Sequence, residues 1–354
     1  MNRIATIIFL SFSTILNAQL FTVESYRDID PFDYDCVFPV VFSSSHAEAA
    51  DRINTYLQYE ALDIIYGAEE TSLFRKVFPP EGEIWGSTEF DYQVNTNTDK
   101  FFSVSITYAG TGAYSEYYVS TYNFVASTGE AIDLEDLFAE TPLSDLGLIV
   151  NQAYYSEITD FMESIVQTDE DMSYQYEMYN ECKEKFVESD WLPTNQFTVM
   201  DDGIRFERER CSNHAMRALD DIGKFSYELS FESLEVFMNG RFYDLMSELV
   251  WNPDDLNIQG KLLKGAIGGK YPITVIFNRP WGGDDIRGVY WYNKVKKPIE
   301  LKGSFKAHGM IELVESIDGK EIAKIIGRVV DGVFSGKWIK SKDGTELSIE
   351  FGLN

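Results

Sequence analysis

The fold of the C-terminal part of this chain is decided by residues 310–353, MIELVESIDGKEIAKIIGRVVDGVFSGKWIKSKDGTELSIEFGL. Short runs rich in β-branched and aromatic residues alternate there with Asp-Gly pairs, which begin at Asp318, Asp331 and Asp343. An Asp-Gly pair suits a two-residue turn with positive backbone φ angles, and such turns join antiparallel strands. The stretch therefore predicts consecutive β-hairpins.

Upstream of this stretch, the same alternation of β-rich runs and turns continues back to Lys261. A glycine or a turn interrupts each β-rich run after a few residues, which predicts short antiparallel strands. The expected strands are 261–267, 271–277, 286–292, 299–305, 310–316, 321–329, 333–339 and 345–353. Eight strands at this spacing are typical of a small barrel or sandwich, so we expect residues 251–354 to form an all-β domain.

Charge divides the chain at the same place. Residues 259–354 hold 16 Lys and Arg against 11 Asp and Glu, whereas residues 1–258 hold 14 against 47. The polar stretch 251–259 is the natural joint between two modules. An acidic surface repels nucleic acid and anionic lipid and attracts cationic proteins. We therefore expect no nucleic-acid partner, although the charge also has a plainer explanation, which is solubility.

The N-terminus has the pattern of a secretory signal peptide. Arg3 is the only charge before an apolar run, Ile4 to Leu16, which is followed by small and polar residues up to Gln19. This run is shorter than the roughly 20 apolar residues of a membrane span. We therefore predict that residues 1–19 are a signal peptide, that the protein is periplasmic or secreted, and that it has no transmembrane segment.

Residues 20–250 mix helical and strand patterns. A long amphipathic helix is expected between the serines at 43–45 and Gly67. Strands are expected at 101–108, 117–125, 197–200, 204–209 and 224–230, and helices at 133–138, 146–166 and 232–249. Residues 167–190 are polar and acidic, with no clear element. Because strands and helices do not alternate regularly, the pattern favours an α+β domain.

Several segments of this module are similar to a known domain. They are 102–113, 118–124, 128–130, 134–138, 197–206 and 225–237. In this order they resemble an extracytoplasmic domain of unknown function. It occurs in lysozyme-sensing anti-sigma factors and ahead of the catalytic domain of some peptidoglycan deacetylases. The resemblance covers most of residues 20–245 and implies a folded, non-catalytic module near the cell wall. This sequence departs from both contexts, since neither a membrane helix nor a deacetylase domain follows the module.

Three cysteines are too few for a disulfide scaffold, although an exported protein can form one bridge. Cys182 and Cys211 are the candidate pair because they lie in the same module and flank one predicted strand. Three buried thiols are the alternative.

Aromatic side chains are the candidate ligand-binding residues. They are Tyr108, Tyr114, Tyr117, Tyr118, Trp281, Tyr290, Tyr292 and Trp338. Along a strand, Tyr290 and Tyr292 share one face while Trp291 points to the other. Exposed aromatic patches commonly mark binding sites. For the residues of the barrel, however, filling of the core is the interpretation that we favour.

The sequence indicates no catalytic or metal site and no cofactor. Its histidines, His46, His214 and His308, are scattered, and neither His-Glu-x-x-His nor paired Cys-x-x-Cys occurs. Four carboxylates within 28–35 could bind calcium, but a solvated acidic segment explains them more simply. We predict a non-catalytic binding protein of the cell envelope that recognises a protein or a glycan. The alternative is an envelope carbohydrate-active hydrolase that uses a carboxylate pair.

Overall fold

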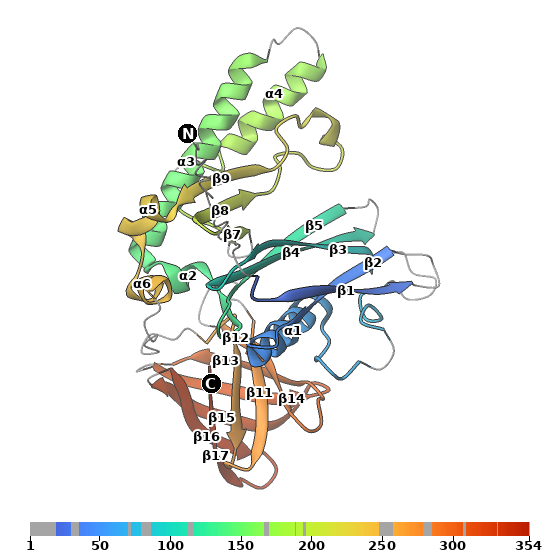
Figure 1. The fold of residues 1–354 in the computed structure, drawn as a ribbon, viewed down its shortest axis with the longest axis vertical. Helices are drawn as coiled ribbons and strands as arrows, with labels where there is room; N and C mark the ends of the chain where they lie inside the picture. Colours follow the sequence, from blue (N-terminus) through green and yellow to red (C-terminus); the bar gives the residue numbers. More distant parts are fainter. Residues whose placement is uncertain are drawn as a thin grey trace, which may run out of the picture.

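The computed structural model describes residues 19–29, 35–69, 72–78, 86–111, 116–165, 170–187, 189–193, 196–247, 258–278, 285–306, 309–330 and 332–353. The expected signal peptide, apart from Gln19, lies outside them. The chain forms an N-terminal α+β region and a C-terminal closed barrel of eight antiparallel strands (Figure 1). The predicted fold class is confirmed. No helix in the described part of the chain is both long enough and apolar enough to cross a membrane.

The α+β region is built on a six-stranded sheet in the order β1-β2-β3-β4-β5-β6. The strands are β1 (Thr22–Ile29), β2 (Asp35–Phe42), β3 (Gly86–Asn97), β4 (Phe101–Thr111), β5 (Glu116–Val125) and β6 (Glu130–Ile132). Neighbours are antiparallel except β2 and β3, which pair in parallel at Cys36 and Phe90. A parallel pair needs a crossover connection. Helix α1 supplies it here.

Helix α1 (Ala47–Leu62) lies between this sheet and the barrel (Figure 1). Ile53 and Leu57 are fully buried, and the same apolar cluster contains Ile276 and Trp291 from the outer wall of the barrel. The helix ends at Asp63, which has a left-handed conformation (φ 52°), earlier than the predicted end near Gly67. The backbone N–H of Asp63 donates to the Tyr59 carbonyl at 2.9 Å, which satisfies one carbonyl of the last turn.

A smaller subdomain follows the first sheet. It comprises α2 (Leu134–Leu137), α3 (Glu140–Ser164), α4 (Glu170–Lys183), β7 (Phe197–Val199), β8 (Gly203–Arg208), the 3₁₀ turn η1 (Arg217–Leu219) and β9 (Phe225–Ser230). Asn123 on β5 joins the two sheets, because its side-chain amide donates to the Phe197 carbonyl and accepts from the Val199 N–H, both at 2.9 Å. The Asn123 amide thus pairs with backbone groups of β7 in the way that a neighbouring strand would.

The helix predicted at 232–249 is broken into three pieces. They are α5 (Phe231–Leu234), the 3₁₀ turn η2 (Glu235–Phe237) and α6 (Gly240–Ser247). The break lies at Met238, which is extended and pairs with Phe138 as an isolated bridge. Asn239 then donates its backbone N–H to the Leu137 carbonyl at 2.9 Å. Tertiary contacts with α2 therefore override the local helical pattern.

The barrel has an up-and-down order. Its strands are β10 (Leu262–Ile267), β11 (Tyr271–Phe277), β12 (Asp285–Tyr292), β13 (Ile299–Phe305), β14 (Met310–Ile317), β15 (Lys320–Val330), β16 (Val333–Lys340) and β17 (Glu346–Gly352). The barrel closes where β10 pairs with β17, and a Cβ on Gly265 would lie 1.9 Å from the Glu350 carbonyl oxygen. Asp318 and Gly319 have positive φ angles, as an Asp-Gly hairpin turn requires.

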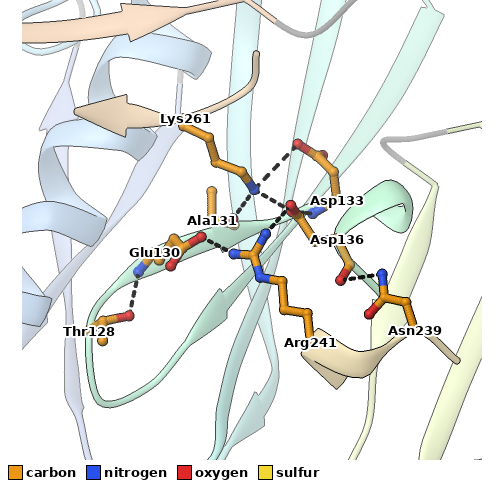
Figure 2. Close-up of polar contacts among 8 residues, drawn as sticks. All are labelled: Thr128, Glu130, Ala131, Asp133, Asp136, Asn239, Arg241 and Lys261. Carbon is orange, nitrogen blue, oxygen red and sulfur yellow. Dashed lines mark hydrogen bonds and ion pairs between the residues drawn. The ribbon is translucent and has the colours of Figure 1, made fainter. Parts of the chain in front are cut away.

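A buried cluster of charges joins the barrel to the α+β region (Figure 2). The Lys261 ammonium, 1% exposed, donates to the Ala131 carbonyl at 2.6 Å and forms an ion pair with Asp136. The Arg241 guanidinium contacts both Asp136 and Glu130. Burial alone would raise the pKa of Asp136, but Lys261 and Arg241 hold it below its usual value. At Glu130 burial outweighs the same two cations, and the pKa is raised.

Removing Lys261 should destabilise the protein strongly. In Lys261→Met, the buried Asp136 loses one of its two cationic partners, and removing one partner of a buried ion pair costs about 3–5 kcal/mol. Lys264→Met on β10 is the matched control, because its pair with Glu48 is largely exposed and should contribute less than about 1 kcal/mol. Urea unfolding of both variants measures the difference. Equal losses would contradict a structural role for the buried cluster.

The structure joins Cys182 and Cys211, the candidate pair of the sequence analysis, in a disulfide with a Cα–Cα distance of 5.4 Å. Cys36 is free and buried. The bridge fastens the end of α4 to the segment after β8 and closes a loop with a sequence separation of 29.

We expect the double variant Cys182→Ala/Cys211→Ala to lose about 3 to 4 kcal/mol of unfolding free energy, because the unfolded chain regains loop freedom. Cys36→Ala is the control for loss of a thiol without loss of a bridge. Urea unfolding under non-reducing conditions compares them. If a reductant lowered the stability of the double variant as much as that of the wild type, the bridge would not be the source of the effect.

Candidate functional site

The end of the β4–β5 hairpin carries three of the predicted tyrosines. Tyr118 stacks on Tyr108, and Tyr108 stacks on the buried Phe90, with ring centroids 5.3 and 5.8 Å apart. Tyr118 is 46% exposed and Tyr117 is 45% exposed. The Tyr117 hydroxyl donates to Glu89 at 3.2 Å. Because successive side chains of a strand point to opposite faces, Tyr118, Tyr108 and Phe90 lie on one face of the sheet, and Tyr117 and Glu89 lie on the other. We call these five residues the tyrosine tip; it presents one exposed tyrosine on each face of the sheet.

Glu116 anchors the tyrosine tip to the small subdomain. Its carboxylate forms ion pairs with Arg210 and, at 3.7 Å, with Arg217, and it lies 2.5 Å from the Nδ1 atom of His214. The hydrogen bond from Arg210 is the main reason why the pKa of Glu116 lies below its usual value. Cys211, next to Arg210, is bridged to α4. The exposed tyrosines are therefore held on a fixed support.

The structure places the predicted barrel aromatics on two sides of the wall. Tyr290 and Tyr292 pack with the interior cluster, and Trp291 packs outside against α1, which confirms the predicted alternation along β12. Trp338 also contacts the interior, and its indole N–H donates to Glu315 at 2.6 Å. Tyr290 is 1% exposed. These rings fill the core of the barrel around one buried carboxyl.

Tyr114 and Trp281 lie outside the described residues, as does most of the acidic segment 28–35. Within the described ranges, no group of three or more His, Cys, Asp or Glu side chains is arranged to hold a metal ion.

Glu315 is 3% exposed, and burial raises the pKa of its carboxyl above the usual 4.5, although the hydrogen bond from Trp338 and the nearby Tyr290 hydroxyl oppose the rise. The folded state therefore keeps this proton to a higher pH than the unfolded state does. Stability from this group is full below about pH 4.5 and is lost as pH rises toward the folded-state value.

Glu315→Gln cannot ionise, and its amide oxygen can still accept from Trp338. We expect the unfolding free energy of this variant, relative to wild type, to increase as pH rises above 4.5. Trp338→Phe should steepen the pH dependence instead, because it removes a donor that stabilises the charged form. Urea unfolding across this pH range measures both. Parallel curves for Glu315→Gln and wild type would refute the shifted pKa.

A cavity of about 480 Å³ lies between the end of α1, the segment after it and the β12–β13 loop of the barrel. Sequence reasoning missed it, because its walls come from two modules. Its lining includes the cations Arg75, Lys76, Lys296 and Lys297. The sequence feature that could have indicated this cavity is the density of basic residues at 75–76 and 294–297.

Two carboxylates also line this interdomain cavity, and each has a partner. Asp63 accepts from the Lys76 ammonium at 3.1 Å, and Glu69 accepts from the Gly67 N–H at 2.8 Å. Lys296 donates to the Tyr66 carbonyl at 2.8 Å. A second cavity of about 240 Å³ adjoins the first and shares Ile65 and Lys296 with it.

Comparison with known proteins gives a limited result. No family model matches the chain, and no curated protein matches it. A solved DUF3298 family member from Bacteroides fragilis NCTC 9343 has 13% identity and a TM-score of 0.44 over 65% of this chain and 98% of its own. A DUF3298 family protein from Pseudomonas aeruginosa PAO1 has 8% identity and a TM-score of 0.35 over 63% and 96%. DUF3298 is an uncharacterised domain, and neither likeness is close enough to carry an argument about the site.

Proposed function

We propose that this protein is an exported, non-catalytic binding protein of the cell envelope that recognises a basic protein, such as a lysozyme, through its acidic module. The Tyr117 face of the tyrosine tip carries the proposal, because it combines an exposed aromatic ring with exposed carboxylates on a rigid support. Tyrosine is among the residues that dominate binding energy in protein interfaces. A preorganised surface also loses less entropy on binding than a mobile one.

Charge supports a basic partner. Glu89 and Asp91 are exposed on β3, on the same face of the sheet as Tyr117. The surrounding module carries 47 Asp and Glu against 14 Lys and Arg over residues 1–258. Complementary charge accelerates encounter and favours partners of opposite sign. The disulfide between Cys182 and Cys211 is compatible with the exported location that the N-terminal sequence predicts. The resemblance to the extracytoplasmic module of lysozyme-sensing anti-sigma factors points to the same class of partner.

The other two hypotheses receive less support. The barrel aromatics predicted as glycan ligands give little support, because Tyr290 is buried and the Trp338 N–H donates to Glu315. A hydrolase would need two carboxylates that face a substrate. In the interdomain cavity, Asp63 and Glu69 already accept hydrogen bonds from Lys76 and Gly67.

Calorimetric titration with a basic lysozyme at physiological salt tests the proposal. We expect measurable binding that weakens as salt is raised. The reason is that the Debye screening length shortens from about 8 Å at 0.15 M salt to about 3 Å at 1 M. Tyr117→Ala should weaken binding by about 2 kcal/mol, or roughly 30-fold, if the tip forms the centre of the interface.

Tyr271→Ala is the matched control, since Tyr271 is a similarly exposed tyrosine on the barrel, 47% exposed against 45% for Tyr117. The affinity of the Tyr271→Ala variant for lysozyme should equal that of the wild type. The absence of heat above dilution would overturn the lysozyme proposal. Equal losses in the two tyrosine variants would remove the tip from the interface.

A further inference from the structure

The interdomain cavity has a charge opposite to that of the protein. The chain carries a formal net charge of −28. Four cations and two carboxylates nevertheless line this cavity. Neither carboxylate is exposed to the cavity without a partner, because Asp63 accepts from Lys76 and Glu69 accepts from the Gly67 N–H. The cations are therefore the charges in excess.

Two residues that line the cavity have an unusual backbone conformation. Asp63 and Lys296 both have φ angles of 52° and both line it. Left-handed backbone is uncommon for residues other than glycine and costs energy unless neighbouring contacts enforce it. Here Lys296 is held by its bond to the Tyr66 carbonyl, whereas Asp63 has the left-handed conformation that commonly ends a helix. Gly67, beside the Lys296 ammonium, has a φ angle of 72°, a conformation that favours glycine.

Both modules contribute to the walls. Tyr59, Ile64 and Ile65 come from α1 and the turn after it, whereas Lys297 and Pro298 come from the barrel. The volume of about 480 Å³ lies within the range of small-molecule sites, which is about 300–1,000 Å³. Tyr59 lines the cavity, and burial, together with the nearby Asp63, Glu60 and Glu300 carboxylates, raises the pKa of its hydroxyl.

We propose that this interdomain cavity binds a small ligand that carries a carboxylate or phosphate group. Lys297 contacts the anionic group directly, since it lines the cavity, is exposed and makes no hydrogen bond or ion pair within the described residues. Arg75 lies on the same lining and adds positive charge. The apolar side chains Ile64 and Ile65 pack against the rest of the ligand. This site is separate from the tyrosine tip, and the proposal does not depend on lysozyme recognition.

Calorimetry of the full chain with three matched probes tests the proposal. Glucuronic acid, glucose 6-phosphate and glucose share one ring and differ in their anionic group. We expect a Kd of about 1 mM or tighter for at least one of the two anions, which corresponds to two charge-assisted contacts, and no binding of glucose. The anion that binds identifies the ligand as a carboxylate or a phosphate.

Lys297→Gln should weaken binding of that anion about tenfold, because it removes one charge-assisted contact. Lys294→Gln is the matched control, since Lys294 is exposed in the same loop but does not line the cavity. Both variants should unfold at the wild-type temperature, which shows that the fold is retained. Absence of binding by both anions, equal binding of glucose, or equal affinities of the two variants would each overturn the proposal.

Discussion

The ion pair between Lys261 and Asp136 is the constraint on which the arrangement of the modules depends. Lys261 precedes the first strand of the barrel, Asp136 lies on α2, and Arg241 on α6 contacts the same carboxylate. Three segments that are distant in sequence thus share one buried carboxylate. Because unpaired buried charges are costly, none of these segments can leave its place without a large penalty. The cluster fixes the start of the barrel relative to β6 and α2.

Once the barrel is fixed in this way, α1 is covered on two sides. Its inner face packs on the sheet, and Tyr59 contacts Trp291 on the barrel wall with ring centroids 6.1 Å apart. The alternation along β12 makes this contact, since Tyr290 and Tyr292 point inward and Trp291 points outward. Where α1 ends at Asp63, the covering is incomplete. The interdomain cavity lies at that place.

Sequence alone predicted the barrel well, because hairpin turns and strand alternation are local signals. Asp318 and Gly319 illustrate this, since their turn geometry follows from the residue types. The first three strands were missed. On β3, exposed polar residues such as Glu89 and Asp91 hide the strand pattern around the buried Phe90. Helix α4 was missed because its sequence is mostly polar, and the bridge at Cys182 and the burial of Tyr179 hold it in place. The cavity depends on contacts between modules, which no local pattern contains.

The division of charge along the chain also has a structural meaning that composition could not give. Some of the lysines that give the barrel its net positive charge contact the acidic module. Lys261 contacts Asp136, and Lys264 contacts Glu48. Lys296 contacts the Tyr66 carbonyl. These lysines compensate acidic or carbonyl groups at the joint, so they contribute to assembly within the chain. Lys297 is different, because it lines the cavity without such a contact among the described residues. A lysine that the joint does not use is available to an anionic ligand, and the acidic residues far from the joint are available to a basic partner.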